Sequence, residues 1–201
     1  TVLKRQTVFG LSLDDAKNII SLDIDADSRT ELCRFTATGM NAYSYQGTDS
    51  GFTLDGTYPG VTSNDMTGSA DATFGTDLNA DGYIDIVNRN TTSDVWSVRS
   101  FNGQQFVSGT FNVPHYEGDK FMFMDVNRDG LPDLVVARQN RLHTYLNQNG
   151  EISPTINGSH PISGTEGILP CNITNYNGMS NFIKVDGDCV YCYTYLRNLQ
   201  E

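Results

Sequence analysis

Apolar and polar residues alternate in four separate stretches of the chain, and each alternation closes on a turn signal. The stretches are Ala42–Phe52, Val95–Phe106, Leu142–Ile152 and Val190–Asn198. A period of two places successive side chains on opposite faces of a β-strand, so one face packs on a core. Gln-Gly at 46–47 and Asn-Gly at 102–103 and 149–150 are typical of hairpin turns. The pattern predicts an all-β protein of short antiparallel strands.

A second pattern repeats along the chain, upstream of these stretches. TDLNADGYIDIV and MDVNRDGLPDLV contain acidic loops that begin at Asp77 and Asp125, 48 residues apart. A looser copy, DIDADSRTEL, begins at Asp23, and the corresponding segment at Ile173, ITNYNGMSNFIKV, keeps Gly178 but has no carboxylate in its loop. Each repeat reads as strand, acidic loop, strand, turn, strand, turn, strand. About 50 residues for four antiparallel strands is the size of one propeller blade.

We therefore expect one β-propeller domain over residues 1–201, built of about four four-stranded antiparallel blades. The fourth repeat stops after its third strand, and residues 1–8 complete that blade if the ring is closed. The alternative, which we favour because four blades is the lower end of the usual range, is that the repeats are consecutive blades of a larger ring. The expected blades span approximately 10–60, 61–114, 115–165 and 166–201.

The charge balance narrows the choice of partners. The 13 Lys and Arg residues against 24 Asp and Glu residues give a formal charge of −11. This argues against nucleic acid or an anionic membrane surface and favours cations. The apolar runs are too short for membrane insertion.

Oxygen-bearing side chains occupy positions 1, 3, 5 and 9 of the acidic loops, where alternating positions of a tight loop turn toward one centre. Gly82 and Gly130 permit the sharp bend at position 6. A backbone carbonyl at position 7 completes a cage of six or seven oxygen donors, which Ca²⁺ prefers. The predicted ligands are Asp23, Asp25, Asp27, Arg29, Glu31, Asp77, Asn79, Asp81, Tyr83, Asp85, Asp125, Asn127, Asp129, Leu131 and Asp133, with 29, 83 and 131 acting through their carbonyls.

An EF-hand does not fit, because position 12 is Asn88 or Val136 within strand-like sequence. Asx-rich turns that bind no metal are the remaining alternative. The first loop has Ser28 at position 6, so we expect different geometry or weaker affinity there. The fourth loop, which offers only Asn175, Asn177 and Asn181, is expected not to bind. The sequence thus predicts about three Ca²⁺ per chain.

The segments Phe74–Val87 and Phe123–Val136, with weaker echoes at Leu22–Leu32 and Ile173–Val185, resemble the FG-GAP family and its VCBS relatives. These repeats form the blades of integrin α-subunit propellers and of many secreted proteins. The spelling of Met124–Val135 is also similar to repeats in the cage-forming B component of bacterial toxin complexes. The resemblance implies a propeller fold and calcium, and it leaves the function open.

The sequence contains no catalytic signature. His115, His143 and His160 lie in different turns or strands, without H-E-x-x-H or G-x-S-x-G. The aromatic residues Trp96, Tyr191, Tyr193 and Tyr195 suit core packing better than a sugar platform. Cys189 and Cys192 form C-x-x-C within an alternating strand, where they point to opposite faces and do not suit one metal. Disulfides are the better interpretation; the candidates are Cys33, Cys171, Cys189 and Cys192.

Four cysteines, three N-x-S/T sequons at 90, 157 and 172, and a start without an initiator Met predict a secreted or extracellular chain, here favoured as part of something longer. We expect a calcium-stabilised, non-catalytic module for cell-surface recognition or adhesion, or a scaffold within a larger assembly. Its partner would be a protein or glycan ligand, further domains of a longer chain, or another subunit. The alternatives are part of a secreted toxin or enzyme whose catalytic portion lies elsewhere, and a carbohydrate-binding lectin.

Overall fold

The computed structural model describes residues 19–47, 51–63, 73–90, 93–162, 164, 168–171, 181–186 and 189–194. Only the backbone is described at 169–171, 181–182, 186 and 189–194. Every regular element in these ranges is a β-strand, which agrees with the predicted all-β class. The described part of the chain therefore has no helix of the length and apolarity needed to cross a bilayer.

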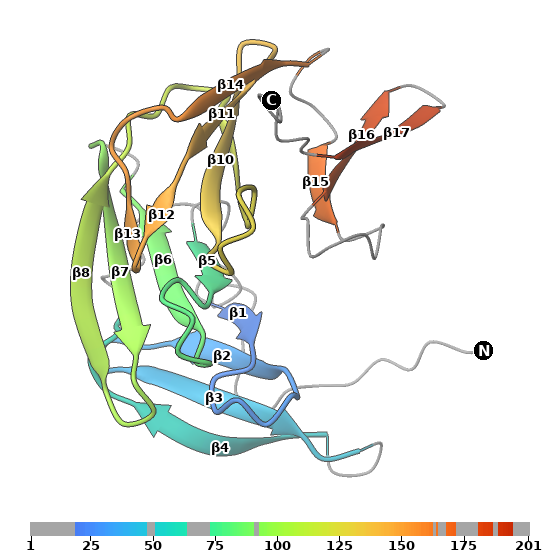
Figure 1. Ribbon diagram of the computed structural model, residues 1–201. Helices are drawn as coiled ribbons and strands as arrows, with labels where there is room; N and C mark the ends of the chain where they lie inside the picture. The colour runs from blue at the N-terminus through green and yellow to red at the C-terminus, as the bar shows by residue number, and fades with distance from the viewer. Residues whose placement is uncertain are drawn as a thin grey trace. The chain divides into compact units, whose positions relative to one another are not determined.

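The strands form antiparallel sheets in which, apart from the pairing of β11 with β14, strands consecutive in the sequence lie side by side (Figure 1). The first sheet has the order β1-β2-β3-β4 and the second β5-β6-β7-β8. The third has the order β9-β10-β11-β14, and the fourth has β15-β16-β17. Strands β12 and β13, which lie between β11 and β14 in the sequence, form a separate two-stranded hairpin. The bounds are β1 Ile19–Leu22, β2 Glu31–Phe35, β3 Met40–Tyr45, β4 Phe52–Tyr58, β5 Thr73–Thr76, β6 Asp85–Arg89, β7 Val95–Phe101, β8 Phe106–Asn112, β9 Lys120–Met124, β10 Asp133–Arg138, β11 Arg141–Tyr145, β12 Asn147–Gln148, β13 Glu151–Ile152, β14 Gly158–Pro161, β15 Ile168–Cys171, β16 Asn181–Asp186 and β17 Cys189–Thr194.

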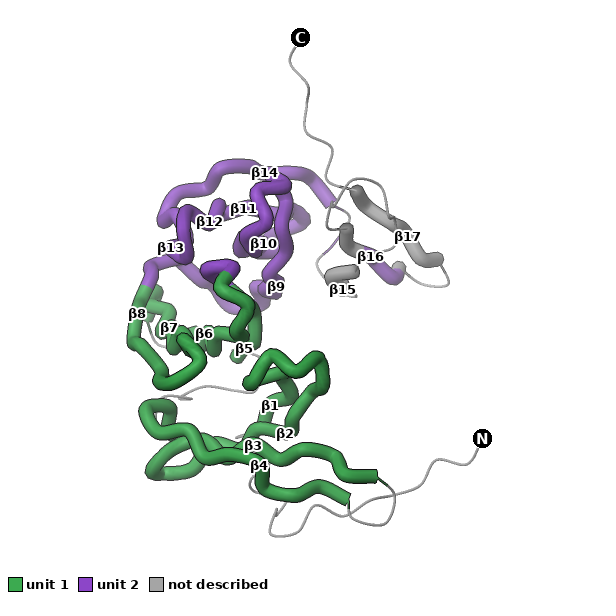
Figure 2. The backbone as a smooth tube through the Cα atoms, turned by 60° about the horizontal axis from the view of Figure 1, so that its bottom comes forward, with its two compact units in different colours: residues 1–77, 81–110 green, residues 78–80, 111–201 purple. Residues whose placement is uncertain are grey.

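The backbone divides into two compact units (Figure 2). Unit 1 comprises Thr1–Asp77 and Asp81–Thr110 and contains the first two sheets. Unit 2 comprises Leu78–Ala80 and Phe111–Glu201, so three residues of the second acidic loop are grouped with the third and fourth sheets.

The core of unit 1 is apolar and draws side chains from both of its sheets. Cys33, Met40 and Ala42 of the first sheet are fully buried, and they share one cluster with Ile86 and Phe101 of the second. Strand alternation explains which residues are buried, because every second residue of β2 faces the core. Glu31 and Cys33 are buried, and Leu32 between them is only half-buried. Contacts between Tyr58 and the Phe101 ring, 5.4 Å between centroids, extend this core.

The core of unit 2 is centred on β10. Leu134, Val135, Val136 and Ala137 are all fully buried, so both faces of this strand are covered. At its end, the Arg138 guanidinium forms an ion pair with Asp119, 2.7 Å between Nη2 and Oδ2. The same guanidinium lies 4.3 Å from the centre of the Tyr116 ring, so it fixes the loop before β9 to β10.

Three four-stranded sheets with sequential strand order match the predicted repeat of strand, loop, strand, turn, strand, turn, strand. The fourth sheet has three strands, as the sequence indicates. The segment 1–8, proposed to complete that sheet, lies outside the described residues, and closure of a ring stays a prediction. One feature differs from expectation: the Asn149–Gly150 turn joins β12 to β13 and does not lead to the fourth blade strand.

Candidate functional site

Each acidic loop connects the first strand of a four-stranded sheet to the second. The three loops span 23–30, 77–84 and 125–132, and each is followed by the position-9 carboxylate that opens the next strand. In all three, the first aspartate accepts a hydrogen bond from the backbone N–H of position 6. The distances are 2.9 Å for Ser28 to Asp23 Oδ2, 3.0 Å for Gly82 to Asp77 Oδ2 and 3.0 Å for Gly130 to Asp125 Oδ2.

The position-5 aspartates are held in a second common contact. Asp27, Asp81 and Asp129 each accept a hydrogen bond at Oδ1 from the backbone N–H of position 7. The distances are 2.8 Å for Arg29 to Asp27, 2.9 Å for Tyr83 to Asp81 and 2.9 Å for Leu131 to Asp129. The other oxygen of the first aspartate also accepts a backbone N–H, from position 5 over 3.1 Å in the first two loops and from position 4 over 2.6 Å in the third. The three loops therefore share most, but not all, of their hydrogen bonds.

The backbone conformation also repeats. Position 4 has positive φ in every loop, at Ala26 (61°), Ala80 (57°) and Arg128 (67°). Position 6 has positive φ at Ser28 (71°), Gly82 (91°) and Gly130 (86°). Ser28 therefore gives the first loop the same backbone conformation at position 6 that glycine provides in the other loops. The expected difference in the metal-binding geometry or affinity of this loop stays a prediction.

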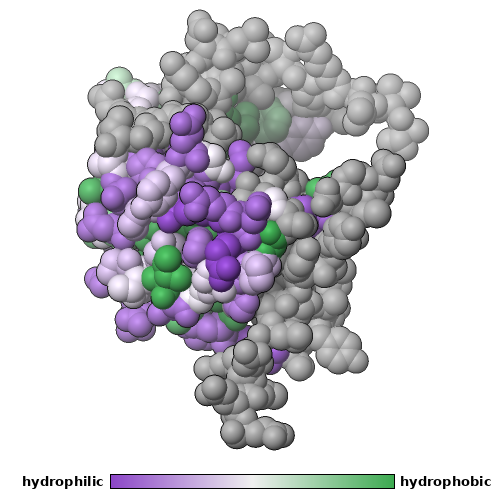
Figure 3. All heavy atoms as spheres, turned by 90° about the horizontal axis from the view of Figure 1, so that it is seen from above, coloured by the Kyte–Doolittle hydropathy of each residue, from purple (hydrophilic) through white to green (hydrophobic). Residues whose placement is uncertain are grey.

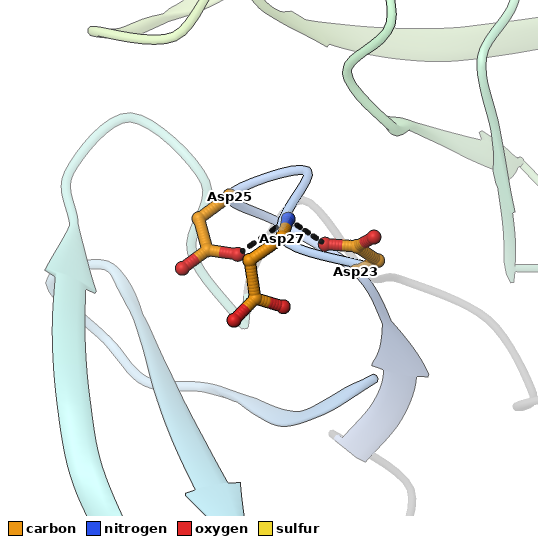
Figure 4. A group of neighbouring side chains, drawn as sticks. All are labelled: Asp23, Asp25 and Asp27. Carbon is orange, nitrogen blue, oxygen red and sulfur yellow. Dashed lines mark hydrogen bonds between the residues drawn. The ribbon is translucent and has the colours of Figure 1, made fainter. Parts of the chain in front are cut away.

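In the first loop, three carboxylates converge (Figure 4). One oxygen each of Asp23, Asp25 and Asp27 lies within 4.8 Å of the others, and their side chains are partly or largely exposed. Within the described residues, no cation forms an ion pair with these three carboxylates. Like charges at this separation destabilise one another, so the group favours a bound cation.

The donor set fits Ca²⁺, because carboxylate, amide and carbonyl oxygens are the ligands that this ion takes. Asp77 with Asp81 and Asp125 with Asp129 would hold it in the second and third loops, together with Asn79 and Asn127. In the third loop Asn127 Nδ2 donates to Asp129 Oδ2 over 2.8 Å, so the two predicted ligand side chains already lie together. The fourth loop, 172–180, lies outside the described residues.

The position-9 carboxylates lie in the protein interior. Glu31 is 2% exposed, and Asp85 and Asp133 are 0% exposed. Asp133 accepts from the backbone N–H of Val126 over 2.9 Å and from that of Asn147 over 2.8 Å. Each position-9 carboxylate therefore connects the strand that it begins to the start of its own loop, to a later strand, or to both. These contacts do not depend on whether the carboxylate also binds metal.

The other two loops share parts of this arrangement. Glu31 accepts from the N–H of Ile24 at 3.2 Å, and Asp85 accepts from that of Phe101 at 3.2 Å. Sequence reasoning assigned position 9 to the metal and missed this buried role. The sequence does indicate this burial, because each of these acids is the first residue of a strand with an alternating or apolar pattern.

Burial raises the pKa of two of these acids. Burial, with a smaller contribution from the charges of Asp129 and Asp125, raises the pKa of Asp133 to about 6 against the lowering effect of its two backbone hydrogen bonds. Burial also raises the pKa of Glu31, with contributions from the neighbouring Asp25 and Asp27 charges. A divalent cation in the loop would favour the ionised forms.

A polar cavity of about 490 Å³ adjoins the first loop in unit 1. Its lining includes Asp25, Asp27 and Glu31, together with Tyr45 and Asp55 of the β3–β4 hairpin. The Tyr45 side chain is 47% exposed and its ring lies 5.4 Å from that of Phe52. The cavity therefore combines carboxylates with an accessible aromatic ring.

The exposed hydrophobic side chains among the described residues are dispersed. In the view of Figure 3, hydrophilic residues prevail over the coloured part of the face, and hydrophobic residues stand in small separate groups. The large hydrophobic side chains that are exposed belong to different strands and loops. They are Tyr45, Leu54, Val95, Val107, Tyr116, Ile156 and Val185.

The structure describes the side chains of some of the aromatic and cysteine residues that the sequence singles out. Trp96 is 0% exposed and its ring stacks with Phe74 at 6.2 Å, so the expectation of core packing is confirmed. Cys33 is a free, fully buried thiol whose pKa burial raises to about 12, so the structure does not support it as half of a disulfide. The side chains of Cys171, Cys189, Cys192, Tyr191, Tyr193 and Tyr195 lie outside the description.

Comparison with known proteins identifies similar folds only. No protein-family model matches the chain, and no curated protein sequence matches it. A lectin of Agrocybe aegerita, described as specifically recognising non-reducing terminal N-acetylglucosamine, is similar in structure, with a TM-score of 0.59, 14% identity and 84% of this chain covered. The Photorhabdus luminescens Tc holotoxin pore, in a mutated form, gives a TM-score of 0.53, 16% identity and 90% coverage.

This chain spans 47% of the lectin chain and 9% of the toxin chain. At these identities the similarity establishes a common β-sheet fold and no shared activity. Both proteins belong to the classes of protein that the sequence left as alternatives, a carbohydrate-binding lectin and a toxin-complex component.

Proposed function

We propose that the chain is a calcium-stabilised, non-catalytic module of β-propeller blades. The observation that carries this proposal is the threefold recurrence of one loop geometry, in which aspartates at positions 1 and 5 are each fixed by a backbone N–H. Asx-rich turns alone do not need carboxylates at both positions in every copy, whereas a pair of carboxylates in one loop favours a divalent cation. The convergence of Asp23, Asp25 and Asp27 within 4.8 Å supports the same interpretation.

Calcium would act on folding directly. Each loop joins two adjacent strands of one sheet, so an ion bound only by the native loop stabilises the whole unit by mass action. At the millimolar calcium of extracellular fluids, sites of modest affinity would be filled. We propose a secreted or extracellular setting for this reason, with the module serving recognition or acting as a scaffold in a larger assembly.

The test is a thermal melt combined with elemental analysis of bound metal, in EDTA and in millimolar Ca²⁺. We expect about three ions per chain and a higher melting temperature in calcium. Asp81→Ala and Asp129→Ala should each remove one ion, while Asn177→Ala should remove none and serves as the matched control. Absence of bound calcium and of any thermal shift would mean that the loops are turns without metal.

Glycan binding is a second candidate, favoured by the similarity to a lectin and by the cavity beside the first loop. An exposed tyrosine ring next to carboxylates and hydroxyls is a common environment for a sugar, which stacks on the ring and hydrogen-bonds to the acids. The site would be formed by Tyr45, Asp55 and Ser44, whose hydroxyl donates to Asp55 over 3.0 Å.

A glycan array that includes terminal N-acetylglucosamine tests this second candidate. We expect binding that is abolished in Tyr45→Ala and retained in Leu54→Ala, a control for an exposed residue of the same hairpin. If no glycan binds, or if both variants bind as the parent does, the cavity is not a sugar site. The ligand of the proposed recognition module would then be a protein.

A further inference from the structure

The hairpin β12–β13 has no counterpart in the first two sheets, and its first residue, Asn147, contacts two acidic loops. Asn147 is 2% exposed, and it lies in unit 2 with Leu78, which is 1% exposed. Its side-chain Nδ2 donates to the carbonyl oxygen of Leu78 over 2.7 Å. Leu78 occupies position 2 of the second loop, between the predicted ligands Asp77 and Asn79.

The same residue is bonded to the third loop. Nδ2 also donates to the carbonyl oxygen of Pro132 over 3.0 Å, and the backbone N–H of Asn147 donates to Asp133 Oδ1 over 2.8 Å. Pro132 and Asp133 are positions 8 and 9 of that loop. Asn147 thus contributes both of its donor groups, side chain and backbone, to the two loops.

Two further contacts hold the hairpin in place. The Asn147 Oδ1 atom accepts from the backbone N–H of Gly150 over 2.8 Å, which fixes the side-chain amide in one orientation. Gly150 lies against the second loop so closely that a Cβ added there would meet Asn79 Cβ at 3.2 Å. The positive φ of Gly150, 89°, and this close approach both require glycine.

We infer that Asn147 is a positioning residue that couples the second and third metal loops, so that metal bound in one strengthens binding in the other. The inference rests on the proposed calcium sites. Metal at Asp125 and Asp129 would further restrain the third loop up to Pro132 and Asp133, to which Asn147 is bonded. Asn147 would pass this restraint through the Leu78 carbonyl to the adjacent Asp77 and Asn79. Coupling between two sites is reciprocal by linkage.

The second loop carries its own probe, because position 7 is Tyr83 there and Arg29 or Leu131 in the other loops. A tyrosine next to the site can sensitise terbium luminescence, and Tb³⁺ takes the same oxygen ligands as Ca²⁺. Emission that is lost in Tyr83→Phe therefore reports the second loop. The phenylalanine keeps the packing of the ring against Phe101, 5.6 Å between centroids.

The experiment is a double-mutant cycle on the full chain, with terbium affinity at the second loop as the readout. Asp129→Ala silences the third loop and should weaken second-loop binding by about fivefold. Asn147→Ala should weaken it to a similar degree, and adding Asp129→Ala to that variant should cause no further loss. Asn147→Ser provides a milder variant if the alanine variant does not fold.

Asn88→Ala is the matched control. Asn88 is also a buried asparagine, 4% exposed, but its Nδ2 donates to Thr73 Oγ1 of β5 over 2.8 Å and not to an acidic loop. It should lower the melting temperature without changing terbium affinity. Unchanged second-loop affinity in Asp129→Ala, or an equal effect of Asp129→Ala with and without Asn147, would overturn the coupling. If wild-type protein shows no Tyr83-dependent emission and binds no calcium, the proposed metal sites themselves are absent.

Discussion

Ser28 adopts a left-handed backbone conformation that glycine occupies in the other two loops. A side chain at positive φ is strained by roughly 1 kcal/mol. The serine lies in a loop with four acids, Asp23, Asp25, Asp27 and Glu31, against three in each of the other loops, so the additional carboxylate can offset the strain when a cation is present. At this position the local conformation is imposed by the loop and not by the residue.

The strain predicts the effect of exchanging residues at position 6. Ser28→Gly should raise the melting temperature by about 2–4 °C, since relief of about 1 kcal/mol has that effect in a chain of this size. Gly130→Ser is the reverse change, and no atom lies within 4 Å of a Cβ added there, so only backbone strain should lower its melting temperature. Differential scanning calorimetry measures both. Opposite shifts are expected; shifts of one sign would mean that side-chain contacts decide stability.

At the scale of the element, the acid at position 9 and the acid at position 5 have separable roles. Asp133 is fully buried and accepts two backbone hydrogen bonds, from Val126 and Asn147, whereas Asp129 is exposed. The first connects strands within unit 2 in any condition. The second would matter mainly when a cation is bound.

Unfolding by urea in EDTA separates these roles. Asp133→Ala leaves two buried N–H groups without acceptors and should lower the free energy of unfolding by about 2–4 kcal/mol. Asp129→Ala should lower it by less than about 1 kcal/mol in EDTA, because an exposed group is resolvated by water. In millimolar calcium the free energy of unfolding of the Asp129→Ala variant should be lower than that of the parent by a larger amount than in EDTA. Equal losses in EDTA for both variants would contradict the distinction.

The sequence predicts most of the strands in the three four-stranded sheets, but not the β12–β13 hairpin. Period-two alternation after each acidic loop identifies β3, β7 and β11, and the loops mark the boundary between the first two strands of each blade. The hairpin β12–β13 was missed, because the Asn149–Gly150 signal predicts a turn but not which strands it joins. The link from Asn147 to Leu78 spans 69 residues and leaves no pattern in a single sequence.

At the scale of the whole molecule, the acidity of the chain and its loops belong to one explanation. A formal charge of −11 disfavours the compact state through self-repulsion. Ten carboxylates lie at predicted ligand positions 1, 3, 5 and 9 of the three loops, and the folded units concentrate them there. The cations that such loops would bind are therefore also the counter-charge that the folded chain needs.

This explanation predicts a large change in electrophoretic mobility. Three divalent ions carry six positive charges and would change the formal charge from −11 to −5. Native capillary electrophoresis at low temperature, where circular dichroism shows the chain folded in both buffers, should give a mobility toward the anode in calcium that is about half of that in EDTA. The double variant Asp81→Ala, Asp129→Ala retains only the first loop and should show about one-third of the parent's shift. Equal mobility of the parent in the two buffers would leave its acidity without a bound counter-charge, and the surface charge would then serve solubility alone.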